Sequence, residues 1–400
     1  MSHLALTNIG ELVTNDPNVA EGPLGILENA AVVISDGLVA WVGSASEVKS
    51  VANSDPIDMH GVAVFPGFVD SHTHLVFDGE RSAEFAARMS GQPYAAGGIR
   101  TTVAATRSAT DDKLRNNIQR LQQEMVSCGI TSTEIKSGYG LDVATEERSV
   151  RLAKEFTDDV TFLGAHVVAP EFSDRADEYV DLVVGEMLTA CAPHAKWIDV
   201  FCDRGAFTVD QTRRILEAGI ANGLQPRIHA HQLENTNAIG MAVELDCASV
   251  DHCTHLTDSD ISVLAASNAV ATLVPGAEFS TRSSYPRGRD LIDAGAKVAL
   301  STDCNPGSSY TTNMPLMIAL AVREMKLTPA EALSAATLGG AQALRRNDVG
   351  RLTVGARADL VALDAPSYIH LAYRPGVPLV SQVWRAGKTV FEVDKRRNHG

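Results

Sequence analysis

Two histidines one residue apart, His72 and His74, are the first residues of the chain whose types and spacing could do chemistry. They follow an apolar run over residues 62–65 and alternate with Val69 and Leu75, so both imidazoles should point to the same side of a strand. Imidazole nitrogens are ligands for Zn, Fe and similar metals. A His-x-His pair also arises by chance at surface or core positions, so the rest of the chain decides between the two interpretations.

The chain after residue 62 alternates short apolar runs with helical patterns. In one of these, over residues 111–128, positions 114, 118, 121, 125 and 128 are apolar and share one helix face. The alternation predicts βαβ units, and eight apolar runs favour a closed (β/α)8 barrel. An open doubly wound sheet is the alternative, but no Gly-x-Gly-x-x-Gly follows the first run. The predicted strands are 62–69, 130–135, 160–164, 197–201, 225–228, 248–250, 269–274 and 297–300.

Polar residues stand at the ends of seven of these eight strands. The chemistry of such barrels lies at the carboxyl ends of the strands, so these residues are expected at one mouth of the barrel. Five other histidines, at positions 3, 60, 194, 370 and 399, lie elsewhere and are expected to be structural or exposed. The residues at the strand ends are His72, His74, Lys136, His166, Asp203, His229, Asp251, His252, Thr302 and Asp303.

Three imidazoles and one carboxylate of this group, from His72, His74, His229 and Asp303, form a donor set for one metal ion with a position left for water. His252 is then free to orient or deprotonate that water, and a packing role is its alternative. Lys136 could instead be a modified lysine that bridges two metals. We prefer a single metal because of the Gly-Tyr-Gly loop beside Lys136 and the placement of the histidines.

The two ends of the chain are predicted to be β-rich. Apolar runs over 31–34 and 38–42 flank Asp36-Gly37, which is a hairpin signal. Residues 1–61 and 348–400 are predicted to form one composite β-sandwich domain, with the barrel over 62–347 inserted between them. Helices are expected at 208–221, 314–325 and 329–345.

Composition excludes several classes of protein. A formal net charge of −15 over 400 residues argues against a nucleic-acid partner. We find no apolar stretch long enough to span a membrane and no signal sequence. The six cysteines lack Cys-x-x-Cys spacing, which fits free thiols in a reducing cytoplasm. Cys304, beside Asp303, is the one candidate for a reactive cysteine.

The residues 66–74, PGFVDSHTH, resemble the opening motif of the amidohydrolase superfamily. The closest resemblance is to the branch that hydrolyses 4-imidazolone-5-propanoate to N-formimino-L-glutamate in histidine degradation. It extends over EIKSGYGL (134–141), FLGAH (162–166), VDH (250–252), STDCNPGSS (301–309) and AAGGIRTT (95–102), and into the tail over residues 358–387. It implies a (β/α)8 barrel with a metal site and a composite β-sandwich, and a homodimer is common among such proteins.

The resemblance also implies roles for individual residues. It implies one Zn or Fe ion on His72, His74, His229 and Asp303. It implies that Arg81 meets the propionate of a small-molecule substrate through two parallel hydrogen bonds; a surface ion pair with Glu80 or Glu84 is the alternative. Further substrate contacts are implied for Tyr139, His166, Gln232 and Ser308, with product contacts for Tyr139, Asn305 and Gly307 and a weaker indication for Tyr94.

Gln232 departs from the acidic residue that many relatives carry at this position, and an amide cannot transfer protons. Gln232 is therefore expected to orient the substrate, with proton transfer left to His252 and Asp303. The hypothesis is a hydrolase acting on a cyclic amide C–N bond. A heterocycle deaminase of the same superfamily and an inactive metal-binding barrel are the alternatives.

Overall fold

The computed structural model describes residues 3–52, 55–91 and 98–393. The chain divides into two compact units. The first contains Met1–Asp70, Gln123–Ser132 and Asn313–Gly400, and the second contains Ser71–Gln122 and Thr133–Thr312. The domain boundaries predicted from the sequence, after residues 61 and 347, differ from this division and stay a prediction.

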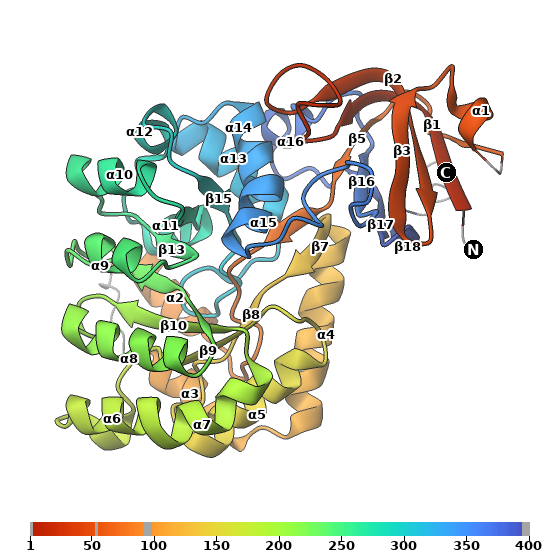
Figure 1. Cartoon of the computed structure of the whole chain (residues 1–400). Helices are drawn as coiled ribbons and strands as arrows, with labels where there is room; N and C mark the ends of the chain where they lie inside the picture. The colour runs from red at the N-terminus through yellow and green to blue at the C-terminus, as the bar shows by residue number, and fades with distance from the viewer. Residues whose placement is uncertain (1–2, 53–54, 92–97, 394–400) are drawn as a thin grey trace. The chain divides into compact units, whose positions relative to one another are not determined.

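The second unit is built around a parallel sheet with the strand order β15-β14-β13-β12-β10-β9-β8 (Figure 1). Its strands follow each other in sequence order, as expected where each strand leads through a helix to the next. They are β8 (Ile135–Lys136), β9 (Val160–Ala165), β10 (Trp197–Cys202), β11 (Gln225–Pro226), β12 (Ile228–Ala230), β13 (Ser249–His252), β14 (Val270–Leu273) and β15 (Val298–Leu300).

The segment that holds the His-x-His pair lies between the first and last strands of this sheet. The backbone N–H of Lys136 donates to the carbonyl of Thr73 at 2.9 Å, and Thr73 forms a parallel bridge with Asp303. The N–H of His74 donates to the carbonyl of Asp303 at 3.1 Å. These bonds bring the ends of β8 and β15 together around residues 72–74, which closes the ring of strands.

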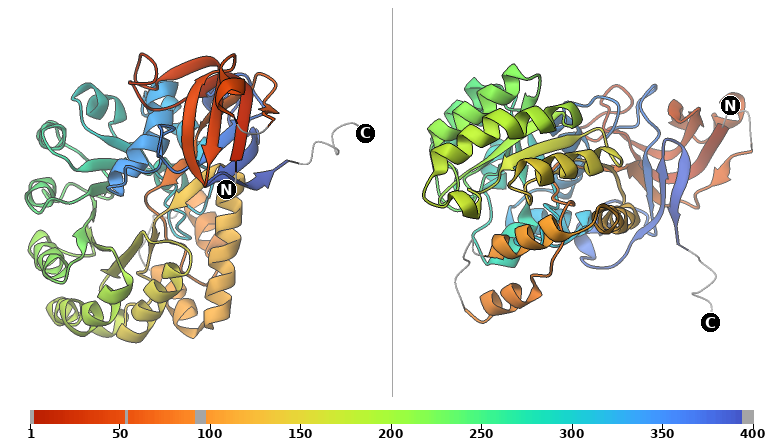
Figure 2. Two further views of the ribbon diagram at one scale, coloured as in Figure 1. Left: turned by 45° about the vertical axis from the view of Figure 1, so that its right-hand side comes forward. Right: turned by 90° about the horizontal axis from the view of Figure 1, so that it is seen from below.

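Helices surround the sheet of the second unit (Figure 2, the green and teal helices). Helix α8 begins after Thr208, whose side chain accepts from the N–H of Gln211 while the Gln211 side chain accepts in return, and this capping box fixes its start. The helices are α2 (Ser82–Met89), α3 (Ile99–Ser108), α5 (Val143–Lys154), α6 (Ala176–Leu182), α7 (Leu188–Cys191), α8 (Val209–Ala221), α9 (Ile239–Glu244), α10 (Asp258–Ala265), α11 (Pro275–Thr281) and α12 (Gly288–Asp293).

The first unit joins both ends of the chain in one mixed sheet of order β18-β17-β16-β5-β1-β2-β3, with β4 also paired to β1. The central strand β5 pairs with β1 on one side and with β16 on the other, so the sheet is formed by strands from both ends of the chain. The strands are β1 (His3–Val13), β2 (Ile26–Ser35), β3 (Leu38–Ser44), β4 (Ile57–Asp58), β5 (Ala63–Pro66), β16 (Leu360–Leu363), β17 (Val380–Arg385) and β18 (Lys388–Glu392).

The predicted hairpin is confirmed in this sheet. Asp36 and Gly37 connect β2 to β3 with φ values of 50° and 83°, the left-handed pair that a two-residue turn between twisted strands requires. One face of the sheet buries a core that includes Leu6, Val32 and Trp384.

The remaining elements of the first unit include the first two barrel strands, which pair as β6 (Phe68–Asp70) and β7 (Ile130–Thr133). Gly67 separates β5 from β6, and a Cβ at this position would lie 2.2 Å from Oγ1 of Thr131, so a larger residue cannot fit. Helix α4 (Asp111–Ser127) continues from the second unit into the first. The other helices of the first unit are α1 (Val48–Val51), α13 (Met314–Glu324), α14 (Pro329–Ser334), α15 (Gly340–Ala343) and α16 (His370–Tyr373). Across the described residues, the helices are too short or too polar to cross a lipid bilayer.

Candidate active site

Three imidazoles and one carboxylate converge where residues 72–74 meet the ends of the strands. Nε2 of His74 lies 3.3 Å from Nε2 of His72 and 3.4 Å from Nε2 of His229. Oδ1 of Asp303 lies 3.4 Å from Nε2 of both His72 and His74. A tetrahedral ion with bonds of about 2.0–2.1 Å separates its ligand atoms by about 3.3–3.4 Å. The distances among His72, His74 and Asp303 therefore fit one divalent metal ion, and His229 adjoins this group through its contact with His74.

The buried polar atoms of the cluster are consistent with this fit. Among the described residues, Oδ1 of Asp303 has no hydrogen-bond partner, while Oδ2 accepts from the Ser308 hydroxyl at 2.6 Å. Burial raises the pKa of Asp303 to about 6. Burial holds the pKa of both His72 and His74 well below the ordinary value, so both imidazoles are neutral and keep a nitrogen lone pair for a metal.

Two carboxylates fix the orientation of two of the histidines. Nδ1–H of His72 donates to Asp251 at 2.6 Å, and Nδ1–H of His229 donates to Asp199 at 3.1 Å. These bonds place the proton on Nδ1 and turn Nε2 toward the cluster, as carboxylate partners of metal-binding histidines do.

Lys136 and Arg227 balance the buried carboxylates. The Lys136 ammonium lies 2.8 Å from Asp199, 3.1 Å from Glu134 and 3.7 Å from Asp251, and Arg227 lies 3.2 Å from Asp251. Burial alone would lower the pKa of Lys136, but the neighbouring carboxylates outweigh it and the pKa is raised. A charged ammonium held by three carboxylates serves as a counter-ion, and this favours the single-metal interpretation over a modified lysine.

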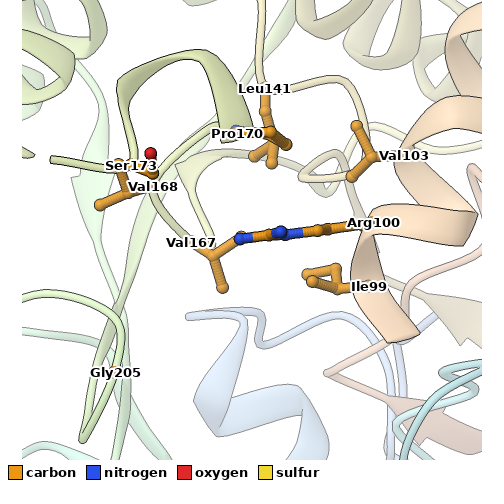
Figure 3. A pocket seen from close by; sticks show the side chains of 9 residues that line it. All are labelled: Ile99, Arg100, Val103, Leu141, Val167, Val168, Pro170, Ser173 and Gly205. Carbon is orange, nitrogen blue, oxygen red and sulfur yellow. The ribbon is translucent and has the colours of Figure 1, made fainter. Parts of the chain in front are cut away.

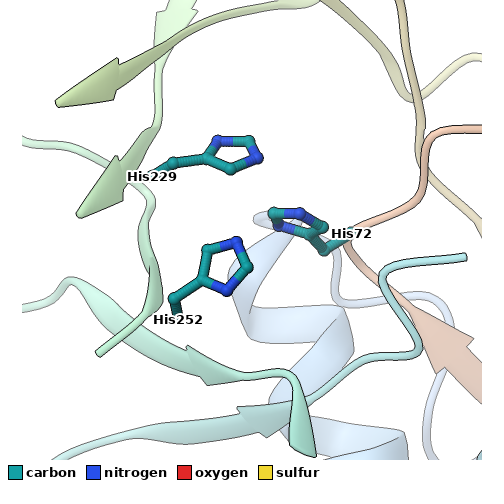
Figure 4. A group of neighbouring side chains, drawn as sticks. All are labelled: His72, His229 and His252. Carbon is teal, nitrogen blue, oxygen red and sulfur yellow. The ribbon is translucent and has the colours of Figure 1, made fainter. Parts of the chain in front are cut away.

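His252 lies beside the four-residue cluster and, with His72 and His229, forms a second group of side chains at metal-ligand spacing. Its ring centroid is 5.4 Å from those of both His72 and His229, and Figure 4 shows the three rings facing one another. Nδ1 of His252 is buried and has no hydrogen-bond partner among the described residues. Burial holds its pKa well below the ordinary value, so the imidazole is neutral.

The backbone is strained at two of these positions. His252 has a φ of 79° and Asp303 has a φ of 66°, in the left-handed region that side chains with a Cβ rarely adopt. The following residues, Cys253 and Cys304, also have positive φ. Such strain is commonly found at functional sites, and here it occurs where β13 and β15 end.

A small cavity of about 60 Å³, hereafter the catalytic cavity, opens next to the cluster. Its lining includes seven of the residues that the sequence proposed as metal ligands, catalytic residues or substrate-binding residues. Its polar lining comes from His74, His166, Arg204, His229, Gln232, His252, Asn305 and Ser308.

The proposed substrate residues at the cavity are held by hydrogen bonds. The Tyr139 hydroxyl donates to Oδ1 of Asn305 at 2.8 Å, and the N–H of Gly307 donates to the same oxygen at 2.8 Å. The His166 ring stacks on His74 with centroids 5.2 Å apart. These contacts fix the amide of Asn305, which lines the cavity, and the phenol of Tyr139, which does not.

Arg81 is buried, and its guanidinium is bonded to Glu84 in the first turn of α2. Nε and Nη2 donate to the two oxygens of Glu84 at 2.9 and 2.8 Å, so the Glu84 pair considered from the sequence exists, although it is not a surface pair. Arg81 also lies against Gly307, where a Cβ would come within 2.3 Å of Nη1. Arg81 does not line the catalytic cavity. Tyr94, the other residue proposed near the same end of the substrate, lies outside the described residues.

Sequence reasoning missed several buried ionisable residues. It considered Asp203 at the end of the fourth strand, but the Asp203 carboxylate accepts from the N–H groups of residues 232–234 and so holds the loop after β12. The carboxylate that reaches the cluster is Asp199, in the middle of β10, and a lone Asp within a buried apolar strand was the available signal.

Glu278 was also missed. It lies in α11, directly after the one strand that lacked a polar end. It is buried and accepts from the Thr254 hydroxyl at 2.7 Å, and burial raises its pKa to about 8.

The fold and this site define a class of protein. The amidohydrolase family model matches residues 63–391, and the chain belongs to this family. Its relatives include proteins named imidazolonepropionase, and the chain is 63% identical to the one of Mycolicibacterium smegmatis over 98% of both chains. It is 61% identical to that of Streptomyces griseus, over 98% of this chain and 100% of the relative. At this identity and coverage the chain is a member of the imidazolonepropionase family.

Solved structures share the fold at low sequence identity. A mutant of the atrazine chlorohydrolase TrzN of Arthrobacter aurescens, in complex with zinc and atraton, has a TM-score of 0.73 at 17% identity, over 97% of this chain and 95% of that chain. A guanine deaminase of C. acetobutylicum has a TM-score of 0.71 at 15% identity, over 98% of this chain and 100% of that chain. The predicted fold class, a (β/α)8 amidohydrolase barrel with a composite β domain, is confirmed.

Proposed function

We propose that this protein hydrolyses the cyclic amide C–N bond of 4-imidazolone-5-propanoate to give N-formimino-L-glutamate, a step of histidine degradation. The observation that carries the proposal is the 63% identity, over 98% of the chain, to a relative named for this substrate. The cluster of three imidazoles and one carboxylate beside the catalytic cavity supports a hydrolytic reaction that uses a metal.

His72, His74, His229 and Asp303 would hold one Zn or Fe ion, since a set of three nitrogens and one oxygen suits both metals. When bound, such an ion acts as a Lewis acid that lowers the pKa of water and polarises a carbonyl. Nε2 would be the donor of His72 and of His229, because Nδ1 of each is already bonded to a carboxylate, and Nε2 of His74 lies 3.3 and 3.4 Å from theirs.

Two residues of the site move protons in the proposed reaction. The imidazole of His252, kept neutral by burial, accepts a proton from the water that attacks the ring carbonyl carbon. Asp303 accepts the second proton of that water and passes it to the ring nitrogen as the C–N bond breaks, and His252 then releases its proton to solvent. The Ser308 hydroxyl, bonded to Oδ2 of Asp303, orients that carboxyl group. The carbonyl carbon ends as a carboxylate and the nitrogen ends in the formimino group.

The remaining cavity residues bind and orient the substrate in this proposal. Gln232 and His166 line the cavity and can bond a ring N–H or C=O. Tyr139, Asn305, Gly307 and Ser308 contact the substrate or the opened product. Arg81 binds the propionate, sharing its guanidinium with Glu84. We also propose a homodimer and a cytoplasmic location, the latter because the six cysteines are free thiols.

The test is turnover by the purified, metal-loaded protein, followed by loss of the imidazolone absorbance and by detection of N-formimino-L-glutamate. Ring opening without ammonia release is expected. Release of ammonia from a purine or triazine, with no ring opening, would instead identify a deaminase. Absence of both reactions with one metal ion bound per chain would identify a barrel that has lost catalysis.

A further inference from the structure

A second cavity, hereafter the outer cavity, adjoins the catalytic cavity in the same unit. Its volume is about 260 Å³, several times that of the catalytic cavity. The two cavities share three lining residues, Ile99, Val167 and Gly205. At these positions a single residue lines both cavities, so a ligand in the outer cavity lies next to the catalytic cavity.

Arg100 is the one charged residue that lines the outer cavity within the described part of the chain. Figure 3 shows its side chain extending from α3 toward Val167, with Ile99 beside it and with Val103 and Leu141 on the other side of its plane. The rest of the wall is mostly aliphatic. The guanidinium thus lies along an apolar wall while Arg100 itself is exposed to solvent.

No described residue compensates the charge of Arg100. Among the described residues, no side chain or carbonyl forms a hydrogen bond or ion pair with it. Three other arginines near the site have partners: Arg81 is bonded to Glu84 at 2.8 Å, Arg204 lies 3.5 Å from Glu234, and Arg88 donates to the carbonyl of Gly307 at 2.8 Å. Within the described part of the chain, Arg100 can therefore offer its N–H donors to a ligand.

We propose that Arg100 forms a carboxylate-binding site in the outer cavity, which an anionic substrate occupies on its way to the catalytic cavity. This inference rests on the proposed function, whose substrate carries a propionate. The chain has a formal net charge of −15, so its overall field repels such a substrate. A local, uncompensated cation at the approach reverses that field and raises the local concentration of the anion. The guanidinium also matches a carboxylate with two parallel hydrogen bonds.

The site acts on capture and not on bond breaking, because Arg100 does not line the catalytic cavity. Its removal should therefore raise KM and lower kcat/KM, with little effect on kcat. The effect should shrink as salt is added, because salt screens attraction between charges that are not buried.

The experiment compares Arg100→Ala, Arg100→Lys and Arg100→Glu with the matched control Arg214→Ala. Arg214 is an exposed arginine of α8, paired with Asp181, whose loss changes the net charge by the same amount. At low salt we expect kcat/KM of Arg100→Ala to fall about tenfold. Arg100→Glu should fall further, Arg100→Lys should regain most of the loss, and the control should match the wild type. Wild-type kcat/KM in Arg100→Ala, an equal loss in the control, or a loss confined to kcat would overturn the proposal.

A binding measurement separates this inference from the proposed function. Glutarate, a plain dicarboxylate, is titrated into the wild type and into Arg100→Ala, and its affinity is measured by calorimetry. Weaker binding to the variant, at low salt only, supports the site even when the wild type opens no imidazolone ring. Equal affinity for the two proteins contradicts the site even when ring opening is efficient.

Discussion

The carboxylate of Asp251 accepts a hydrogen bond from Nδ1 of His72 at 2.6 Å, and both side chains are fully buried. The same carboxylate lies 3.2 Å from Arg227. Asp251 therefore contacts both the imidazole of His72, whose Nε2 faces the cluster, and the guanidinium of Arg227. This contact sets the orientation of His72, so that its Nε2 is turned toward the cluster.

Replacing Asp251 should weaken metal binding without abolishing the fold. Asp251→Asn keeps an oxygen that accepts from Nδ1 but removes the negative charge that increases the basicity of the imidazole. We expect the affinity for Zn to fall about 10–100-fold, as measured by competition with a coloured chelator. Asp159→Asn is the control, since Asp159 is also buried but pairs with Lys196. Equal metal affinity in wild type and Asp251→Asn would show that this contact does not support the site.

His252 should be needed for turnover but not for metal binding. Because its imidazole lies next to His72 and His229 without belonging to the four-residue set, His252→Ala should retain one ion per chain. We expect kcat to fall about 10²–10⁴-fold, the usual contribution of a general base. His194→Ala, at a partly exposed histidine beside Glu147, is the control. A His252→Ala variant as active as the wild type would mean that another group accepts the proton.

Glu278 should make stability depend on pH in a defined direction. Burial raises its pKa from 4.5 to about 8, so the folded protein favours the neutral acid. Its contribution is fully present below pH 4.5 and is lost as the pH rises toward 8. Between pH 6 and 8, the metal-free wild type should lose about 2–3 kcal/mol of unfolding free energy relative to Glu278→Gln. Urea unfolding at several pH values measures this difference, and parallel curves for the two proteins would rule out the assignment.

The strands were predictable because each is an apolar run bounded by helical patterns, and the ends of parallel strands must meet at one edge of the sheet. For the same reason the sequence could place the His72–His74 pair together with His229 and Asp303, which lie far from it in the chain. Their spacing of 3.3–3.4 Å could not be predicted, because it depends on how residues 72–74 join the ends of β8 and β15.

Other features of the site depend on side-chain packing that no sequence pattern encodes. Asp199 lies inside a strand and not at its end, and only the neighbouring position of His229 on β12 reveals its partner. The role of Arg81 toward the substrate stays a prediction; its two hydrogen bonds to Glu84 depend on the start of α2 and could only be named as an alternative from the sequence. Glu278 follows an ordinary apolar strand, and its burial arises from the packing of α11.

The most direct test of the account is a crystal structure of the active protein, with anomalous diffraction measured at the Zn and Fe edges and with the metal content determined on the same sample. One ion per chain is expected, bonded to Nε2 of His72, His74 and His229 and to Asp303 at about 2.0–2.2 Å. Full ring-opening activity in metal-free protein, an ion bound elsewhere, or two ions bridged by Lys136 would contradict it.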